Sequence, residues 1–372
     1  MIERPEVLIV GAGPTGLASA LFLADRGVRV RVVDKAPLPT TTSRAQVVNP
    51  RSLELLAKTG VTERILAEGR VVTAVKFYEE WAPVAEIDYR ELPSPYRLTV
   101  LPQARTEAIL AVALEARGVV PERSLAFETL VQDEANVMAS LKRADGGVVT
   151  VTVPLLLAAD GAHSRVREAL NVPFEGHVFP EPWPLFDVEL DCPLDLDSAH
   201  ISLVHGGLVF MLAIRPGLWR VFGDVDNVLE RVPPGSVVGK VAWESSFHIA
   251  DKLAGSHAVG RVALAGDAAH IHSPVGARGM NLGIEDAWVY AACAEGALNG
   301  NTSRIDDYAR LRRPIHARIV GRMDRLTALA RGPRWVGMLR NTLLPAVAGF
   351  GPAARMMRDF VSGLDHDVTV DG

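Results

Sequence analysis

The stretch EVLIVGAGPTGLASALFLADRGVRVRVVD (residues 6–34) decides the fold. An apolar, β-rich run leads into the turn GAGPTG, and the following residues have the spacing of a helix that ends at Gly27. A second alternating strand ends at Asp34, 18 residues after Gly16. This order of strand, G-x-G-x-x-G, helix, strand and acid is typical of a dinucleotide site. Pyrophosphate approaches the helix N-terminus and the acid binds a ribose, but the motif alone does not separate FAD from NAD.

Two further stretches place a carboxylate directly after a buried strand. TVPLLLAADGAHSRVREAL (152–170) reads as a strand, the pair Asp160 and Gly161, and a polar turn into a helix. GRVALAGDAAHIHSPVGARGMNLGIEDAW (260–288) reads as a strand, a turn with Asp267, several positions with almost no side chain, and a helix. A chain gives up side chains where another backbone or a flat ligand comes close. The second stretch therefore predicts a ligand packed against its backbone.

The three motifs together resemble those of a known family. GAGPTG at the start, ADGAHSRVR in the middle, and AGDAAH with GMNLGIEDA near the end look like the para-hydroxybenzoate hydroxylase family. These proteins are single-component FAD-dependent aromatic monooxygenases. The resemblance spans Gly11 to Asp286 in the family's order. It implies an α/β fold, in which a Rossmann-like FAD-binding domain is interleaved with a mostly antiparallel β-sheet substrate domain and followed by C-terminal helices.

The resemblance implies a role for each motif residue. The ADP half of FAD would be held by Gly11, Gly13, Pro14, Thr15, Gly16, Asp34 and Lys35. The resemblance places Arg44 at the pyrophosphate and Gln103 near the ribityl chain, with Arg105 close behind. Asp160 and Gly161 would lie near both FAD and the nicotinamide nucleotide. Gly266 and Asp267 would lie at the ribityl hydroxyls. Pro274 would face the isoalloxazine, with backbone N–H groups of Gly279, Met280 and Asn281 beside it. A positive helix end there would stabilise reduced, negatively charged flavin.

The chain departs from the family's pattern at two places. Asp34 stands where the family commonly has Glu, and the shorter acid can still bind a ribose. The residues Gly-Ala-Arg-Gly (276–279) stand where the family commonly has Gly-Gly-Gln-Gly. Arg278 therefore either adds a positive charge near the flavin or points to solvent, and the sequence favours neither alternative.

Two β-rich insertions between the motifs predict the substrate domain. The expected divisions are 1–71, 103–173 and 254–330 for the FAD-binding domain, 72–102 and 174–253 for the substrate-binding domain, and 331–372 for a C-terminal helical segment. Residues 200–225 predict a hairpin that turns at Arg215-Pro216-Gly217. Candidate lining residues of an apolar substrate pocket are Phe210, Leu212, Trp219 and Phe222, each of which has a core role as its alternative. His205 and His248 are candidate bases for a phenol, with a structural role as the alternative. The catalytic candidates are Pro274, His205 and Arg220, the last by resemblance to a family arginine near the cofactor.

Composition and charge exclude several other classes. The 39 Lys and Arg are spread along the chain against 44 Asp and Glu, a net charge of −5, which does not describe a nucleic-acid surface. There is no signal-peptide core and no run of the ~18 apolar residues that a membrane span needs. Cys192 and Cys293 form no CxxC or metal spacing. We expect a cytoplasmic monomer or homodimer without a metal; contact of the apolar stretch 334–361 with a membrane surface is the lesser alternative to packing.

The family implies a reaction that the cofactor carries. NADH or NADPH would dock on the flavin domain and reduce FAD, and O₂ would add to the reduced flavin. The resulting C4a-hydroperoxide would deliver one oxygen atom to an aromatic or polyketide-like small molecule. Ring hydroxylation, Baeyer–Villiger insertion and epoxidation all fit this scheme. Alternatives on the same fold are a halogenase, whose WxWxIP signature is missing, an isoprenoid reductase and a non-redox isomerase of the lycopene-cyclase type. A plain NAD dehydrogenase leaves Asp160 and Asp267 unexplained.

Overall fold

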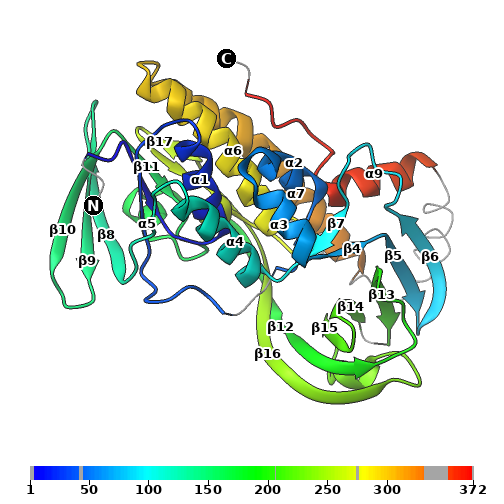
Figure 1. The fold of residues 1–372 in the computed structure, drawn as a ribbon. Coiled ribbons are helices and arrows are strands. Elements are labelled where there is room, and N and C mark those ends of the chain that lie inside the picture. The colour runs from blue at the N-terminus through cyan, green and yellow to red at the C-terminus, as the bar shows by residue number, and fades with distance from the viewer. Residues whose placement is uncertain (1–3, 42–44, 206, 274–275, 331–350, 371–372) are drawn as a thin grey trace.

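The computed structural model describes residues 4–41, 45–205, 207–273, 276–330 and 351–370. A parallel sheet with its helices lies at one side of the molecule, and a larger, mostly antiparallel sheet lies at the other (Figure 1). The chain passes between the two regions several times, so segments far apart in sequence share each of them. The α/β class with interleaved regions expected from the sequence is confirmed.

The first strand lies inside a five-stranded sheet of order β17-β18-β11-β1-β2. Parallel pairing joins β1 (Val7–Val10), β2 (Val30–Val33), β11 (Leu155–Ala158) and β18 (Val262–Leu264), and the short β17 (Ala258–Val259) is antiparallel to β18. Successive side chains of β1 point to opposite faces. Val7 and Ile9 pack with the helices, and Leu8 and Val10 pack against a second sheet. Burial on both faces explains why this strand is apolar throughout.

Each face of the parallel sheet has its own cover. One face carries α1 (Pro14–Ala24), α4 (Gln103–Glu115) and α6 (Gly279–Leu298). The other carries an antiparallel sheet of β8 (Leu125–Gln132), β9 (Val137–Arg143) and β10 (Val148–Val153). Further helices are α2 (Pro50–Leu56), α3 (Val61–Glu68), α5 (Arg165–Ala169), α7 (Arg304–Ala330) and α9 (Gly351–Ser362), with 3₁₀ turns η1 (Ala57–Thr59), η2 (Val228–Arg231) and η3 (Gly266–Ala268).

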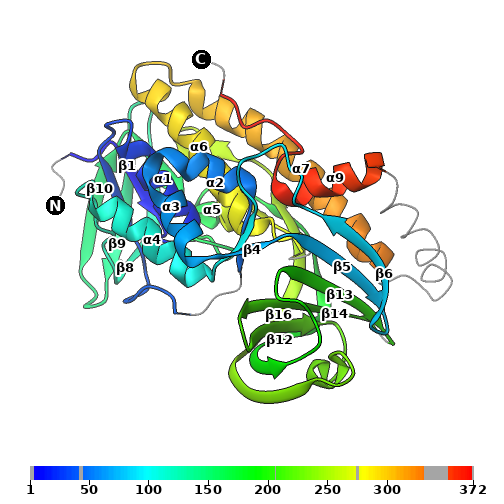
Figure 2. The ribbon, with the colours of Figure 1, turned by 45° about the vertical axis from the view of Figure 1, so that its right-hand side comes forward.

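The large sheet has the order β19-β16-β12-β15-β14-β13-β5-β6. Its strands are β5 (Ala74–Glu79), β6 (Ala82–Asp88), β12 (Phe174–Asp191), β13 (Ser198–Val204), β14 (Gly207–Arg215), β15 (Leu218–Gly223), β16 (Val237–Ala254) and β19 (His270–Ile271). The long strands β12 and β16 connect this sheet with the helical region (Figure 2). A small sheet of β3 (Val47–Val48), β7 (Leu98–Val100) and β4 (Arg70–Val72) lies between the two regions. The hairpin predicted within 200–225 is confirmed as β14 and β15, with Gly217 at φ +76° in its turn.

Glycines let the three sequence motifs lie in close contact with one another. A Cβ atom at Gly16 would overlap the carbonyl oxygen of Gly11, and one at Gly11 would overlap that of Ala159 at the end of β11. A Cβ atom at Gly283 in α6 would overlap the hydroxyl of Thr15. These contacts bring the N-termini of α1 and α6 to the same edge of the sheet.

The C-terminal part of the chain is helical where it is described. α7 begins at Arg304, close to the helix expected from 307, and α9 occupies the last part of the stretch expected to be helical from 334 to 361. Residues 331–350 of that stretch lie outside the described residues. Within the described part of the chain, no helix combines the length and the apolar character needed to cross a bilayer.

The backbone contact beneath α1 can be tested by changing single glycines. Gly16→Ala forces a methyl group into the Gly11 carbonyl, so we expect the free energy of unfolding to fall by about 3 kcal/mol. Gly13→Ala is the matched control, because Gly13 has an extended backbone and no atom lies within 4 Å of the place that its Cβ atom would take. Its stability should change by less than about 0.5 kcal/mol. Thermal unfolding of the two ligand-free variants measures both effects, and equal losses would contradict the contact.

Candidate active site

One cavity of about 790 Å³ joins the helical region to the large sheet. Its volume falls within the usual range for small-molecule and cofactor sites. The N-termini of α1 and α6 open on it, as do the end of β2, the start of α4 and residues of β12, β14, β15 and β16. Of the residues expected from the sequence, the cavity brings together Gly13, Pro14, Thr15, Asp34, Gln103, Gly161, Arg220, Asp267, Gly279, Met280, Phe210, Leu212, Phe222 and His248.

At one end of the cavity lie the start of α1 and the end of β2. Gly13 is the N-cap residue of α1, and the open space beside its Cα leaves room for a ligand. The carboxylate of Asp34 accepts hydrogen bonds from the backbone N–H groups of Ala12 and Ala36, each at 2.7 Å, and the Arg123 guanidinium lies 3.7 Å from it. Backbone donors thus fix the orientation of this acid at the cavity. An open helix N-terminus beside a fixed acid suits a pyrophosphate and a ribose.

Further polar groups on the cavity wall come from two different elements, η3 and α4. Asp267 lies in η3 and is exposed, although its neighbours Gly266 and Ala268 are buried. Gln103 begins α4, and its amide donates to Glu107 at 2.9 Å. Burial raises the pKa of Glu107, against the lowering effect of the bond from Gln103. An exposed carboxylate in an otherwise buried turn is placed to accept hydrogen bonds from hydroxyl groups of a ligand.

The far end of the cavity is apolar and comes from the large sheet. Phe210, Leu212 and Phe222 lie on it as expected, and the rings of Phe210 and Phe222 are 4.5 Å apart. Arg220 also faces this side, and its guanidinium donates to both carboxylate oxygens of Asp187, at 2.7 and 2.9 Å. The bidentate pair holds the arginine in one orientation.

Two substrate-domain candidates do not lie on the cavity. Trp219 precedes Arg220 on β15 and therefore points to the opposite face, where it packs with Met211 and Val221. Its expected place in the pocket is corrected to a place in the core of the large sheet. His205 is an exposed residue in the turn between β13 and β14 and is not part of the cavity wall. His248, on β16, lies on that wall instead.

Several expected cofactor residues support the site rather than line it. Arg105 is corrected to the surface, where it pairs with Glu68, because its helical position turns it outward. Asp160 accepts the N–H groups of Arg165 and Val166, at 2.8 and 3.3 Å, and so holds the start of α5. The buried Asn281 bonds the backbone of residues 47, 49 and 277. The other expected residues that do not line the cavity are Gly11, Gly16, Lys35 and Gly266. Arg44 and Pro274 lie outside the described residues.

The structure decides against one of the two alternatives that the sequence left open for Arg278. Its side chain is fully buried, which excludes the alternative that it points to solvent. Its guanidinium is instead paired with Asp365 at 2.8 Å, from the segment after α9. Arg278 also belongs to the cavity wall and directly precedes α6. The start of this helix therefore carries a buried positive charge that is paired with a carboxylate.

Sequence reasoning missed several cavity residues. His270 and His272 lie in the quoted stretch 260–288, so polar side chains beside its glycine-rich turn were a usable signal. Gln46 lies two residues after Arg44. Glu107 and Arg123 carried no such signal, because only the fold brings α4 and the segment before β8 to the end of β2. Burial lowers the pKa of His272 to about 4, so its ring is neutral near pH 7.

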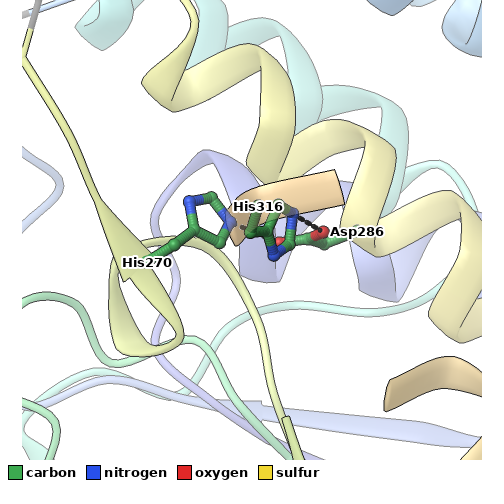
Figure 3. A group of neighbouring side chains, drawn as sticks. All are labelled: His270, Asp286 and His316. Atoms are coloured by element: carbon green, nitrogen blue, oxygen red, sulfur yellow. Dashed lines mark hydrogen bonds and ion pairs between the residues drawn. The ribbon is translucent and has the colours of Figure 1, made fainter. Parts of the chain in front are cut away.

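A buried network that begins at the cavity wall contains His270, Asp286 and His316 (Figure 3). The carboxylate of Asp286 accepts N–H groups from both histidines, at 2.8 and 2.9 Å. It also accepts the Gly266 N–H at 3.0 Å and Arg312 Nε at 2.7 Å. Burial would raise the pKa of Asp286, but His316 and Arg312 hold it well below its usual range.

The composition of this network also resembles a metal site, since two imidazoles and a carboxylate lie within reach of one ion. The guanidinium of Arg312 argues against that use, because it would face a second cation across the same carboxylate. The distances fit hydrogen bonds, and the network ties η3 to α6 and α7. It thereby holds the turn that carries Asp267.

Comparison with known proteins identifies the family. A family model described as FAD binding domain matches residues 4–211 and 225–323. The chain belongs to this family. FAD is accordingly its cofactor, and the resemblance to para-hydroxybenzoate hydroxylase-like monooxygenases is confirmed. The open space at Gly13 and the exposed carboxylate of Asp267 fit that cofactor.

Individual relatives carry monooxygenase and hydroxylase names. The chain is 35% identical to 6-methylpretetramide 4-monooxygenase of Streptomyces rimosus, over 94% of its own length and 65% of that relative's. It therefore spans slightly less than two thirds of that protein. Among solved structures, p-nitrophenol 4-monooxygenase of Pseudomonas putida has a TM-score of 0.88 at 22% identity, covering 98% of this chain and 99% of its own, which is a likeness of fold. The anhydrotetracycline hydroxylase of Streptomyces rimosus has a TM-score of 0.82 at 27% identity, covering 100% of this chain and 78% of its own.

The carboxylate in η3 provides a direct test of the cofactor site. Asp267→Asn removes the charge that would accept ribityl hydroxyl groups, so we expect FAD affinity to fall by about tenfold to a hundredfold. Quenching of flavin fluorescence on titration measures this affinity. Asp306→Asn on α7 is the matched control, because Asp306 is exposed and away from the cavity wall. Unchanged affinity in the Asp267 variant would remove this residue from the site.

Proposed function

We propose that this chain is a FAD-dependent monooxygenase that uses NADH or NADPH and O₂. It would insert one oxygen atom into an aromatic or polyketide-like small molecule. The observation that carries the proposal is a single cavity with a cofactor end at α1 and α6 and an apolar end on the large sheet. When bound, FAD supplies electron transfer and oxygen activation. The protein's part is to hold the cofactor, position the substrate and exclude water.

Each end of the cavity suits one part of that task. The N-terminus of α1, with Gly13, would hold the pyrophosphate, and Asp34 the adenosine ribose. Gly279 and Met280 would place the positive end of α6 beside the ring system, where it favours negative charge on reduced flavin. Asp267, which lines the same cavity, would accept hydrogen bonds from the ribityl hydroxyl groups.

The apolar end of the cavity suits a flat, poorly hydrated substrate. Phe210 and Phe222 present aromatic side chains, and Leu212 adds an aliphatic one. Such a wall excludes water from the reacting atoms. Arg220, held by Asp187, would supply fixed positive charge at this wall, and His248 is a titratable side chain within reach of the cavity. We propose His248 in place of His205 as the group that accepts a phenolic proton, and segments 72–102 and 174–253 as the substrate domain.

The names of the relatives favour oxygen insertion over the alternatives on the same fold. One relative is named 6-methylpretetramide 4-monooxygenase and one solved structure anhydrotetracycline hydroxylase, and both names describe the oxygenation of a small molecule. A non-redox isomerase would use no nicotinamide nucleotide. The free Cys192 and Cys293 suit a reducing, cytoplasmic compartment, which we include in the proposal.

The proposed activity predicts nucleotide-dependent oxygen uptake. The FAD-loaded protein should consume O₂ with NADH or NADPH, and one or more members of a panel of phenols and polyketide aromatics should stimulate the rate. An oxygen electrode measures O₂ uptake, and absorbance at 340 nm, recorded in parallel, measures oxidation of the nucleotide. Oxidation of neither nucleotide by protein with bound flavin would contradict the monooxygenase proposal and favour the isomerase or an enzyme supplied with reduced flavin by a partner.

Two aromatic residues on adjacent strands distinguish the pocket from the core. Phe210→Ala should enlarge the substrate end and lower the amount of product per NAD(P)H by about threefold or more, because water reaches the reacting atoms. Trp219→Ala lies on the opposite face, so it should lower stability by about 3 kcal/mol and leave this ratio unchanged in the folded fraction. Product analysis against nucleotide consumption gives the ratio. If Trp219→Ala lowered the ratio and Phe210→Ala left it unchanged, the substrate would lie on the opposite face of the sheet.

A further inference from the structure

A buried positive charge lies directly before the helix that opens on the cavity. Arg278 is the N-cap residue of α6 and lies on the cavity wall with Gly279 and Met280. Its side chain is 0% exposed. Its Nε and Nη2 atoms have no hydrogen-bond partner among the described residues. A buried guanidinium that is only partly hydrogen-bonded is costly, unless a ligand or a counter-charge makes use of it.

The counter-charge comes from the far end of the chain. Arg278 Nη1 donates to the Asp365 carboxylate at 2.8 Å and to the carbonyl oxygen of Phe360. Glu285, about two turns along α6, lies 3.7 Å from Nη2. Burial would raise the pKa of Asp365, but its bonds with His366 and Arg278 lower it to about 2, so it is ionised at neutral pH.

The segment after α9 is held firmly enough to act as a support. The backbone carbonyl groups of Gly363 and His366 accept hydrogen bonds from the Arg51 guanidinium of α2, at 3.3 and 3.2 Å. The imidazole of His366 bonds Asp365 at 3.0 Å and Glu285 at 2.7 Å. Val368, further along, is buried in the core of the helical region. Figure 1 shows this segment running beside the helices of that region.

Charges from three elements contact Arg278 or its two acidic partners. They are Glu285 on α6, Arg312 and Arg322 on α7, and Asp365 and His366 after α9. Asp365 is the one that makes a hydrogen bond to the guanidinium. Phe360 packs against it as well, with the guanidinium carbon 5.2 Å from the ring centre.

We propose that Arg278 and Asp365 are positioning residues that tune the flavin: Asp365 holds and partly neutralises the Arg278 charge, which favours the reduced, anionic cofactor. The inference rests on the proposed function, in that it takes FAD bound with its ring at the start of α6. The charge of Arg278 adds to that of the helix N-terminus, because both lie at the same end of α6. Neutralising Arg278 and neutralising Asp365 must then move the flavin equilibrium in opposite directions.

The midpoint potential of bound FAD, measured anaerobically against a reference dye, tests this proposal. In Arg278→Gln the ratio of reduced to oxidised flavin at a fixed potential should fall about tenfold, which is about 30 mV for a two-electron couple. In Asp365→Asn, which keeps an acceptor oxygen for the arginine, the same ratio should rise about threefold. Arg278→Lys keeps the charge and should stay within about twofold of the unmodified protein.

Controls separate this role from a merely structural one. Arg355→Gln removes an exposed arginine of α9 and should leave the potential unchanged. Shifts in the same direction for Arg278→Gln and Asp365→Asn, or no shift in either, would overturn the proposal. If Arg278→Gln fails to hold FAD, the Asp365→Asn result decides alone: a rise supports the proposal, and no rise overturns it. Unmodified protein that binds no FAD contradicts the proposed function itself, whereas bound FAD that is insensitive to both variants contradicts only this inference.

Discussion

The cavity depends on close contacts at glycines, where there is no room for a Cβ atom. Gly16 lies against the carbonyl of Gly11, and Thr15 lies between the glycines at 266 and 283. These contacts bring the N-termini of α1 and α6 to one edge of the parallel sheet. Each helix end carries unpaired N–H groups and a partial positive charge. Two such ends facing one cavity create a site for a long ligand with anionic or polarisable groups at both ends.

The remaining parts of the site are built around that convergence. The large sheet supplies an apolar wall with one oriented arginine, Arg220. Behind the cofactor end, the buried carboxylate of Asp286 gathers N–H groups from η3, β19 and α7 and so fixes the turn that carries Asp267. Breaking a buried charge network of this kind is strongly destabilising, because the remaining charges lose their partners. Rigid support of this kind suits a cofactor site, where small displacements change the chemistry.

The glycine-rich motifs predicted the parallel sheet, α1 and the cofactor end of the cavity, because their spacing encodes local backbone geometry. The predicted hairpin was equally local. Assigning faces on β15 failed for Trp219, since an apolar strand buried on both sides gives no sign of which alternate residues meet the ligand. The partners of Arg278 were beyond prediction for another reason. Asp365 lies 87 residues further along the chain, and only the completed fold brings the two charges together.

A crystal structure of the FAD-loaded protein tests the central claim most directly. We expect the pyrophosphate at the N-terminus of α1, the ribityl hydroxyl groups at Asp267, and the isoalloxazine at the start of α6, facing Phe210 and Phe222. Flavin bound elsewhere, or bound with its ring away from the first turn of α6, would contradict the convergence of the two helix ends as the basis of the site.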